Sequence, residues 1–159
     1  MFAELSSLCQ KLPTLGGSTR HGVTSCFTQI HTRSYPCLLP WYNLFYPLVN
    51  GVRIKVFPVL ELHYFDALML AVLVMDDGSF TPSGFYIHTK GFTFIDVYRL
   101  AGVLHYNFGL VCTVQSHEGM PVLYITAKSM PSFISIVKPH MHPRFYYKLG
   151  IGTFKDSIS

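Results

Sequence analysis

The stretch LMLAVLVMDDGSF, from Leu68 to Phe80, decides the fold, because its apolar run ends abruptly in two aspartates and a glycine. The chain has only 8 acidic residues, and Asp-Asp-Gly occurs once. The pattern predicts a helix over about 61–76. Carboxylates at the C-terminal end of a helix oppose its dipole, so we expect a cation or a metal ion to compensate them. The simpler interpretation is that Asp-Asp-Gly merely ends a buried helix.

Composition limits the classes of protein to consider. Half of the 159 residues are hydrophobic and 13% are charged, which excludes a disordered chain. No apolar run reaches the ~18 residues of a membrane span, so we expect no membrane partner. The net charge of +4 fits a polyanionic partner. The four cysteines show no CxxC spacing, which argues against a zinc site or a disulfide framework.

The remaining pattern predicts an α+β fold, an antiparallel sheet with helices packed on one face and a binding surface on the other. The HEGM sequence at 117–120 predicts a hairpin turn. The other expected elements are a helix over 2–12, a loop over 13–22, a strand over 23–32, a helix over 35–49, an extended piece over 51–58, strands near 84–89, 110–116 and 121–127, helices over 93–109 and 131–137, and one more turn within 142–150.

These residues resemble a known family. LAVLVMDDG (70–78) resembles the LAGLIDADG motif of homing endonucleases, in particular the second motif of monomeric, two-motif organellar enzymes, which commonly reads MDDG. Residues 84–114 resemble the strand and helix after that motif, 124–150 resemble the terminal IKP…P…YKL segment, and 27–58 resemble the stretch between the two motifs. The resemblance covers about residues 23–150 in collinear order.

The resemblance implies an organisation as well as a fold. We expect an N-terminal helix and linker over 1–22, a remnant of a first repeat over 23–58, a complete second repeat over 59–150, and a tail over 151–159. The family pairs two motif helices side by side. We therefore expect the Ala67 and Ala71 face to need a cover, either residues 2–12 or a partner protein.

The same resemblance implies site residues. Asp77 matches the aspartate that ligates Mg²⁺, and Asp76 is beside it. Lys55 of KVFP and Lys148 of YKLG match basic residues that assist the nucleophilic water, and we expect both on the same side of the fold as Asp77. For each lysine the alternative is a solvated charge. Gly78 is expected to allow a sharp turn out of the helix.

Candidate nucleic-acid contacts come from two groups of residues. Five cations are candidates for phosphate contacts: Lys90, Arg99, Lys128, Lys138 and Arg144. Six residues lie at alternate strand positions, and we expect about half of them to face the core: Tyr86, His88, Thr113, Gln115, Tyr124 and Thr126.

Two functions follow from different classes of protein. Because only one motif is present, we expect a nuclease-derived protein that binds structured organellar RNA, ribosomal or intronic, within a larger mitochondrial complex and without cleaving alone. The alternative is an active, Mg²⁺-dependent DNA endonuclease completed by a partner chain or a dimer, which the retained Asp77, Lys55 and Lys148 favour. A third interpretation is a folded remnant without a partner.

Overall fold

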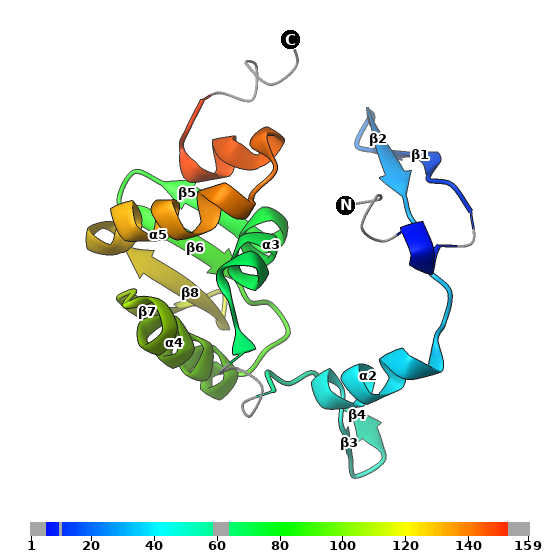
Figure 1. The fold of residues 1–159 in the computed structure, drawn as a ribbon, viewed down its shortest axis with the longest axis horizontal. Helices are drawn as coiled ribbons and strands as arrows, with labels where there is room; N and C mark the ends of the chain where they lie inside the picture. Colours follow the sequence, from blue (N-terminus) through cyan, green and yellow to red (C-terminus); the bar gives the residue numbers. More distant parts are fainter. Residues whose placement is uncertain (1–5, 10, 59–63, 153–159) are drawn as a thin grey trace. The chain divides into compact units, whose positions relative to one another are not determined.

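The structure is a computed structural model that describes residues 6–9, 11–58 and 64–152. The chain divides into two compact units, Met1–Tyr42 and Asn43–Ser159, which we describe separately (Figure 1). This boundary differs from the one predicted between repeats at 58/59. The assignment of 23–58 to a first repeat concerns ancestry and stays a prediction.

The first unit is built on a two-stranded ribbon. β1 (Thr14–Arg20) pairs antiparallel with β2 (Val23–Gln29) through a two-residue turn. His21 and Gly22 both have positive φ, as the tight hairpin turn requires. The prediction of a loop over 13–22 is therefore wrong, because cross-strand pairing overrides the weak strand propensity of the two glycines at 16 and 17.

The two helices expected in this part of the chain are shorter than predicted. The predicted helix over 2–12 lies partly outside the described residues, and within them only a 3₁₀ turn forms, η1 (Ser6–Leu8). The predicted helix over 35–49 is shorter too: η2 (Pro36–Leu38) leads into α2 (Leu39–Phe45), which continues into the second unit. β3 (Leu48–Val49) and β4 (Val52–Arg53) form a hairpin instead, since Asn50 and Gly51 adopt positive φ.

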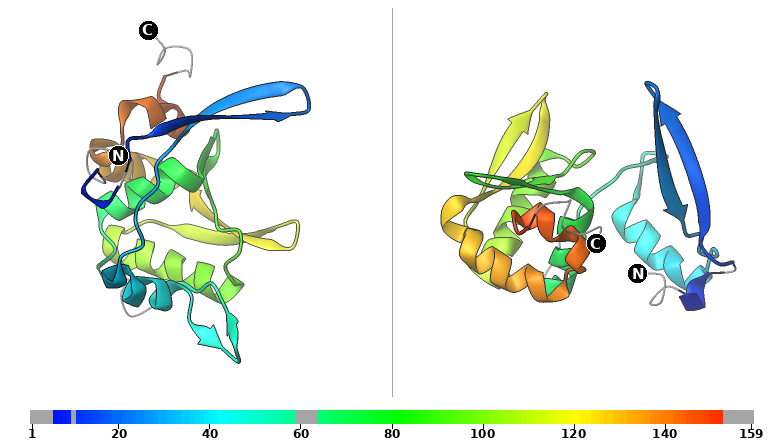
Figure 2. Two further views of the ribbon diagram at one scale, coloured as in Figure 1. Left: turned by 90° about the vertical axis from the view of Figure 1, so that its right-hand side faces the viewer. Right: turned by 90° about the horizontal axis from the view of Figure 1, so that it is seen from above.

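The second unit has the predicted α+β architecture. Four antiparallel strands stand in the order β5-β6-β8-β7, formed by β5 (Gly78–Thr81), β6 (Gly84–His88), β7 (Cys112–His117) and β8 (Met120–Thr126). The helices α3 (Ala67–Asp77), α4 (Phe94–Phe108) and α5 (Met130–Val137) lie over one face of this sheet (Figures 1 and 2). Three 3₁₀ helices complete the unit: η4 (Ala127–Ser129), η5 (Lys138–His140) and η6 (Pro143–Leu149).

The expected strands, the turn at Glu118 and Gly119, and the helices α4 and α5 are confirmed. Two details differ. The motif helix begins at Ala67, later than the predicted 61, because the Asp66 carboxylate accepts from the Met69 N–H and caps it. The strand β5 was not predicted, although GSFTPSGF places two extended pieces around a short turn.

The core of this unit lies between the sheet and its helices. The inward strand residues Phe85, Ile87, Leu123 and Ile125 are fully buried, together with Leu70, Val74, Leu100, Leu104 and Phe133 from the helices. In the described chain, no helix is long and apolar enough to cross a membrane.

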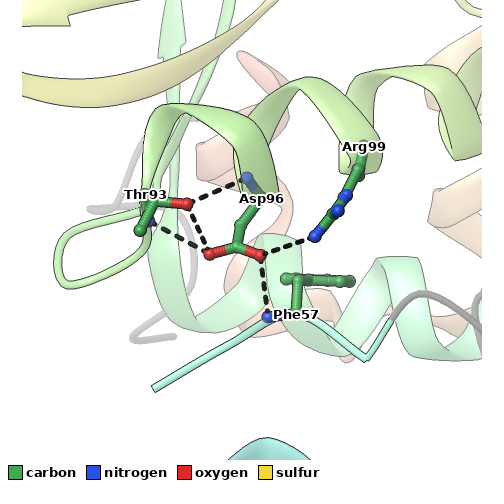
Figure 3. Close-up of polar contacts among 4 residues, drawn as sticks. All are labelled: Phe57, Thr93, Asp96 and Arg99. Atoms are coloured by element: carbon green, nitrogen blue, oxygen red, sulfur yellow. Dashed lines mark hydrogen bonds and ion pairs between the residues drawn. The ribbon is translucent and has the colours of Figure 1, made fainter. Parts of the chain in front are cut away.

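A buried carboxylate joins α4 to the segment before the motif helix. Asp96 is 3% exposed, and its carboxylate accepts from the N–H and hydroxyl of Thr93 and from the N–H of Phe57, while Arg99 lies 3.7 Å away (Figure 3). Thr93 in turn accepts from the Asp96 N–H, completing a capping box. Because Phe57 is far from Asp96 in sequence, this carboxylate fixes tertiary structure as well as the start of α4.

Replacing Asp96 by Ala is therefore expected to leave several donors without their acceptor and to lower the free energy of unfolding by about 2 kcal/mol. Urea denaturation measures the change. The matched control is Asp76→Ala, which removes an exposed carboxylate from a helix C-terminus and is expected to be neutral or slightly stabilising. Equal effects of the two substitutions would contradict this role for Asp96.

Burial changes the titration of one thiol, that of Cys112. Burial raises the pKa of Cys112 to about 12, because the thiolate would lose its hydration. The folded state therefore keeps a proton that an unfolded thiol releases at about pH 8.5. The contribution of the protonated Cys112 thiol to the free energy of unfolding is therefore complete below that pH. It is lost as the pH rises towards 12.

At pH 8.5 we expect iodoacetamide to modify the exposed Cys26 and Cys37 much faster than Cys112 in the folded chain. Peptide mapping by mass spectrometry gives the three rates separately. In denaturant the rates should converge. A Cys112 that reacts in the folded chain as fast as Cys26 would show that the thiol is not protected.

Candidate nucleic-acid and metal site

The motif helix delivers two carboxylates to the surface at its C-terminal end. Asp76 and Asp77 are both exposed, and β5 begins at the next residue, Gly78. Within the described residues, neither carboxylate is engaged in a hydrogen bond or an ion pair. Both are therefore available to ligands from solution.

Gly78 is needed for space and not for turning. The chain leaves the helix at Gly78, as expected, but its φ is −84°, which any residue adopts, so the turn does not require the conformational freedom of glycine. A Cβ here would clash with the Val74 carbonyl oxygen and would lie 2.5 Å from the ring of Phe85. The helix end and the sheet approach each other too closely for a side chain, which fixes where Asp77 emerges.

The cation expected at this helix end is Lys148. Its ammonium group donates to the carbonyl oxygens of Met75 (2.5 Å) and Asp76 (2.9 Å). These are orphan acceptors of the last helical turn, where the dipole is negative. Lys148 thus offsets the cost of two carboxylates beside those carbonyls, and it lies on the same side of the unit as Asp77, as expected.

Lys55 lies near the same end of the sheet but contacts a different element. Its ammonium group is 4.1 Å from the ring centroid of Phe92, in the loop after β6. The antiparallel register pairs Gly78 with Ile87, so the start of β5 and the end of β6 lie at the same end of the sheet. The bond from Phe57 to Asp96 holds the segment that carries Lys55 there (Figure 3).

The five candidate phosphate contacts lie on separate elements. Lys90 and Lys128 are exposed directly after β6 and β8, and Arg144 is exposed in η6. Lys138 lies 5.5 Å from the ring of Tyr146. Arg99 is half-exposed in the helical layer, where it pairs with Asp96, so part of its charge is already compensated.

The sheet face opposite the helices gathers all six of the alternating residues. The register places Tyr86 opposite Tyr124 and Tyr124 opposite Thr113, while Gln115, Val122 and His88 form the neighbouring row. Thr126 stands opposite Gly84 on the same face. Residues directly opposite each other share a face. The expectation that half of the six face the core is wrong, because the strands are aligned with matching parity.

This open face is ordered by its own hydrogen bonds. The rings of Tyr86 and Tyr124 lie 4.9 Å apart, and the Tyr86 hydroxyl donates to Gln115 (3.1 Å). The Tyr124 hydroxyl donates to the carbonyl oxygen of Ser83, and the Ser79 hydroxyl lies 3.0 Å from Nε2 of His88. The roles of Ser79 and Ser83 were missed because they depend on the unpredicted strand β5 and its turn.

The exposed strip of the motif helix differs from the expected one. Ala71 is fully buried in the core of its own unit and Ala67 is half-buried, so the prediction that this face needs residues 2–12 or a partner as a cover is wrong for Ala71. The outward residues are Leu68, Met69 and Val72, which are 51%, 46% and 41% exposed. Ala71 therefore packs into the core together with the larger Leu70 and Val74, while Leu68, Met69 and Val72 face outward.

Comparison with known proteins now gives the family. Residues 1–133 match the LAGLIDADG DNA endonuclease family. The chain belongs to this family. Its fold resembles that of a solved structure described as the homing endonuclease I-WcaI bound to its DNA recognition sequence, with a TM-score of 0.80 and 24% identity, covering 96% of this chain and 70% of the other.

Curated relatives include both endonucleases and maturases. Intron-encoded endonuclease ai4 of Dictyostelium discoideum is 46% identical over 55% of this chain and 57% of its own length. Cytochrome b mRNA maturase bI2 of Saccharomyces cerevisiae is 34% identical over 62% of this chain and 24% of its own length. The matched part thus spans from a quarter to just over half of these relatives. Probable intron-encoded DNA endonuclease 3 of Mycosarcoma maydis is 30% identical over 68% of this chain and 82% of its length.

In this LAGLIDADG unit, Lys148→Met removes the donor to the two carbonyl oxygens at the end of α3. We expect faster amide hydrogen exchange at Asp77 and Gly78 and a loss of about 1 kcal/mol of stability. Lys148→Arg, which keeps the charge, should restore part of the protection. Lys138→Met is the control, because that lysine contacts Tyr146. Unchanged exchange in Lys148→Met would contradict a capping role.

Proposed function

We propose that the chain binds nucleic acid across the open face of its four-stranded sheet and that these 159 residues do not cleave it by themselves. The observation that supports this most is the shared face of Tyr86, His88, Thr113, Gln115, Tyr124 and Thr126. The face offers hydroxyl, amide and imidazole groups for base edges and sugars, and an aromatic pair for unstacked bases.

Charge and exposure support the same surface. The chain carries a net charge of +4, and Lys90 and Lys128 are exposed just beyond strands of this sheet. Phosphate contacts from such cations give affinity without sequence preference, while the side chains on the face discriminate between bases. Such separate roles for cations and for face residues fit a sheet that is open on one side and covered by helices on the other.

Structured RNA is the target that we favour, within a larger complex that includes other proteins. Two relatives are named cytochrome b mRNA maturases. The names of three others give an intron-encoded origin. These names also favour an organelle, which we propose to be the mitochondrion. The Tyr86 and Tyr124 pair suits bases in loops and bulges better than a closed duplex.

Cleavage by these residues alone is disfavoured by the donor set at the helix end. Asp77, with Asp76 beside it, would hold one side of a Mg²⁺ ion, because free carboxylate oxygens are the ligands that Mg²⁺ prefers. Among the described residues there is no cluster of three or more His, Cys, Asp or Glu side chains. When bound, Mg²⁺ would lower the pKa of a water and polarise the phosphodiester. Asp77 and Lys148 would position and stabilise one side of that centre.

The alternative is a Mg²⁺-dependent DNA endonuclease whose second carboxylate comes from a partner chain or a second copy. The exposed Leu68, Met69 and Val72 strip beside the carboxylates supports it, since a second helix packed there would bring another carboxylate near Asp77. The solved structure of similar fold is bound to DNA, which also favours this reading.

Affinity for intron and ribosomal RNA fragments at several salt concentrations tests the binding surface. We expect Thr113→Ala/Gln115→Ala to weaken binding about tenfold, because polar contacts to bases are lost. Removing the charge of Lys128, Lys138 or Arg144 should weaken it and flatten the salt dependence. Asp77→Asn should leave RNA affinity nearly unchanged. RNA binding that ignores every substitution on the open face would overturn the proposed surface.

Incubation of the purified chain with Mg²⁺ and a library of duplex DNA tests the proposed lack of cleavage. Because these residues supply only one side of the metal centre, we expect the rate to lie at least about 10²-fold below that of a complete site. Specific double-strand cleavage by the chain alone, abolished by Asp77→Asn, would establish the endonuclease instead. Cleavage that appears only after a partner chain is added would support the alternative function.

A further inference from the structure

The first unit contains a pocket that is separate from the sheet described above. Its volume is about 260 Å³, and all its lining residues belong to residues 1–42: Lys11, Leu12, Thr14, His31, Thr32 and Arg33. Pockets that enclose whole small molecules measure roughly 300–1,000 Å³. This pocket therefore suits one group of a ligand and its immediate neighbours.

The lining residues of the pocket lie at the open end of the β1-β2 ribbon and in the segments that flank it. The two chain segments are paired at Thr14 and Gln29, where the β1-β2 hairpin begins, and again at Cys9 and Thr32. The N–H of Arg33 also donates to the carbonyl oxygen of Leu8 (2.9 Å). Between these two pairings the N-terminal stretch is longer in sequence than its partner by two residues, and the pocket is lined from both sides, by Lys11, Leu12 and Thr14 and by His31, Thr32 and Arg33.

The chemistry of the lining is that of an anion site. Lys11 and Arg33 are cations, His31 carries an imidazole, and Thr14 and Thr32 offer hydroxyl groups. Within the described residues, the side chains of Lys11, His31 and Arg33 make no hydrogen bond or ion pair. The sequence has no acidic residue between Leu5 and Pro58, so this stretch supplies no counterion of its own. Glu4, the one acid before it, lies outside the described residues.

We propose that this pocket binds a phosphate group, either from the backbone of a nucleic acid or from a free phosphate compound. Phosphate presents several acceptor oxygens, and the lining presents donors of three kinds: ammonium, guanidinium and hydroxyl. Leu12, an exposed residue of the lining, offers an apolar surface for the attached sugar. The inference does not depend on nucleic acid binding at the open sheet face.

The test uses the full chain and one double variant. Lys11→Gln/Arg33→Gln removes both cations from exposed positions, and Lys11→Arg/Arg33→Lys keeps both charges as the matched control. In the first arm, affinity for RNA is measured from 50 to 200 mM salt. In the second, inorganic phosphate and a nucleoside monophosphate are titrated separately while the ring signal of His31, assigned with His31→Gln, is followed by NMR.

We expect the Gln variant to lose about tenfold in RNA affinity and about one unit of slope in log K against log salt, and the charge-keeping variant to lose neither. We also expect phosphate to move the His31 signal in the parent chain and not in the Gln variant. An effect in the RNA arm alone assigns the pocket to the polymer backbone, and an effect in the titration alone assigns it to a free phosphate compound.

No change in either arm would overturn the proposal. The outcome is distinguishable from failure of the proposed function, because Thr113→Ala/Gln115→Ala tests the open face independently. Suppose that the Thr113 and Gln115 substitutions weaken RNA binding, the Gln variant does not, and phosphate leaves the His31 signal unchanged. This result would support the proposed function and refute phosphate binding in the pocket.

Discussion

The second unit depends on how its motif helix ends. The last carbonyl oxygens of α3 and the carboxylates of Asp76 and Asp77 place negative charge at one point, directly before the chain enters β5. Lys148 donates to two of those carbonyls, from a residue more than seventy positions along the chain. A cation that is distant in sequence therefore stabilises the helix end that carries Asp77. Gly78 allows the same helix end to lie close to Phe85.

Lys148 has more than one consequence for the site. Two of its three N–H donors bind backbone carbonyl oxygens, so its charge is held at a fixed position near Asp77. Lys55, in contrast, is bound only through the face of Phe92 and retains all its donors within the described structure. The two lysines matched to the family's basic residues thus differ physically: one is tied to the motif helix and the other has donors to offer a ligand.

The two faces of the sheet have different side chains, one set for the core and one for the proposed nucleic-acid surface. The inward face contributes Phe85, Ile87, Leu123 and Ile125 to a core shared with the helices. The outward face carries polar and aromatic side chains that bond mainly to one another and to loops. Substitutions on the outward face are therefore expected to have little effect on the core, which allows the proposed binding surface to be tested separately from stability. The pocket of the first unit adds two cations, Lys11 and Arg33, from the segments that flank the β1-β2 ribbon.

Local sequence determined much of the second unit. Thr93 with Asp96, Glu118 with Gly119, and Asp76-Asp77-Gly78 place a helix start, a hairpin turn and a helix end, because each signal acts within a few residues. The motif also indicated the family.

Sequence could not show that all six alternating residues share one face, since that depends on the register between strands far apart in the chain. It could not show the ribbon at 14–29 either, because pairing outweighed weak local propensity there. Tertiary structure alone decided that Ala71 is covered, that Lys148 reaches the carbonyls of α3, and that Lys11 meets Arg33 in one pocket. Each of these depends on packing between distant segments, which no short stretch of sequence encodes.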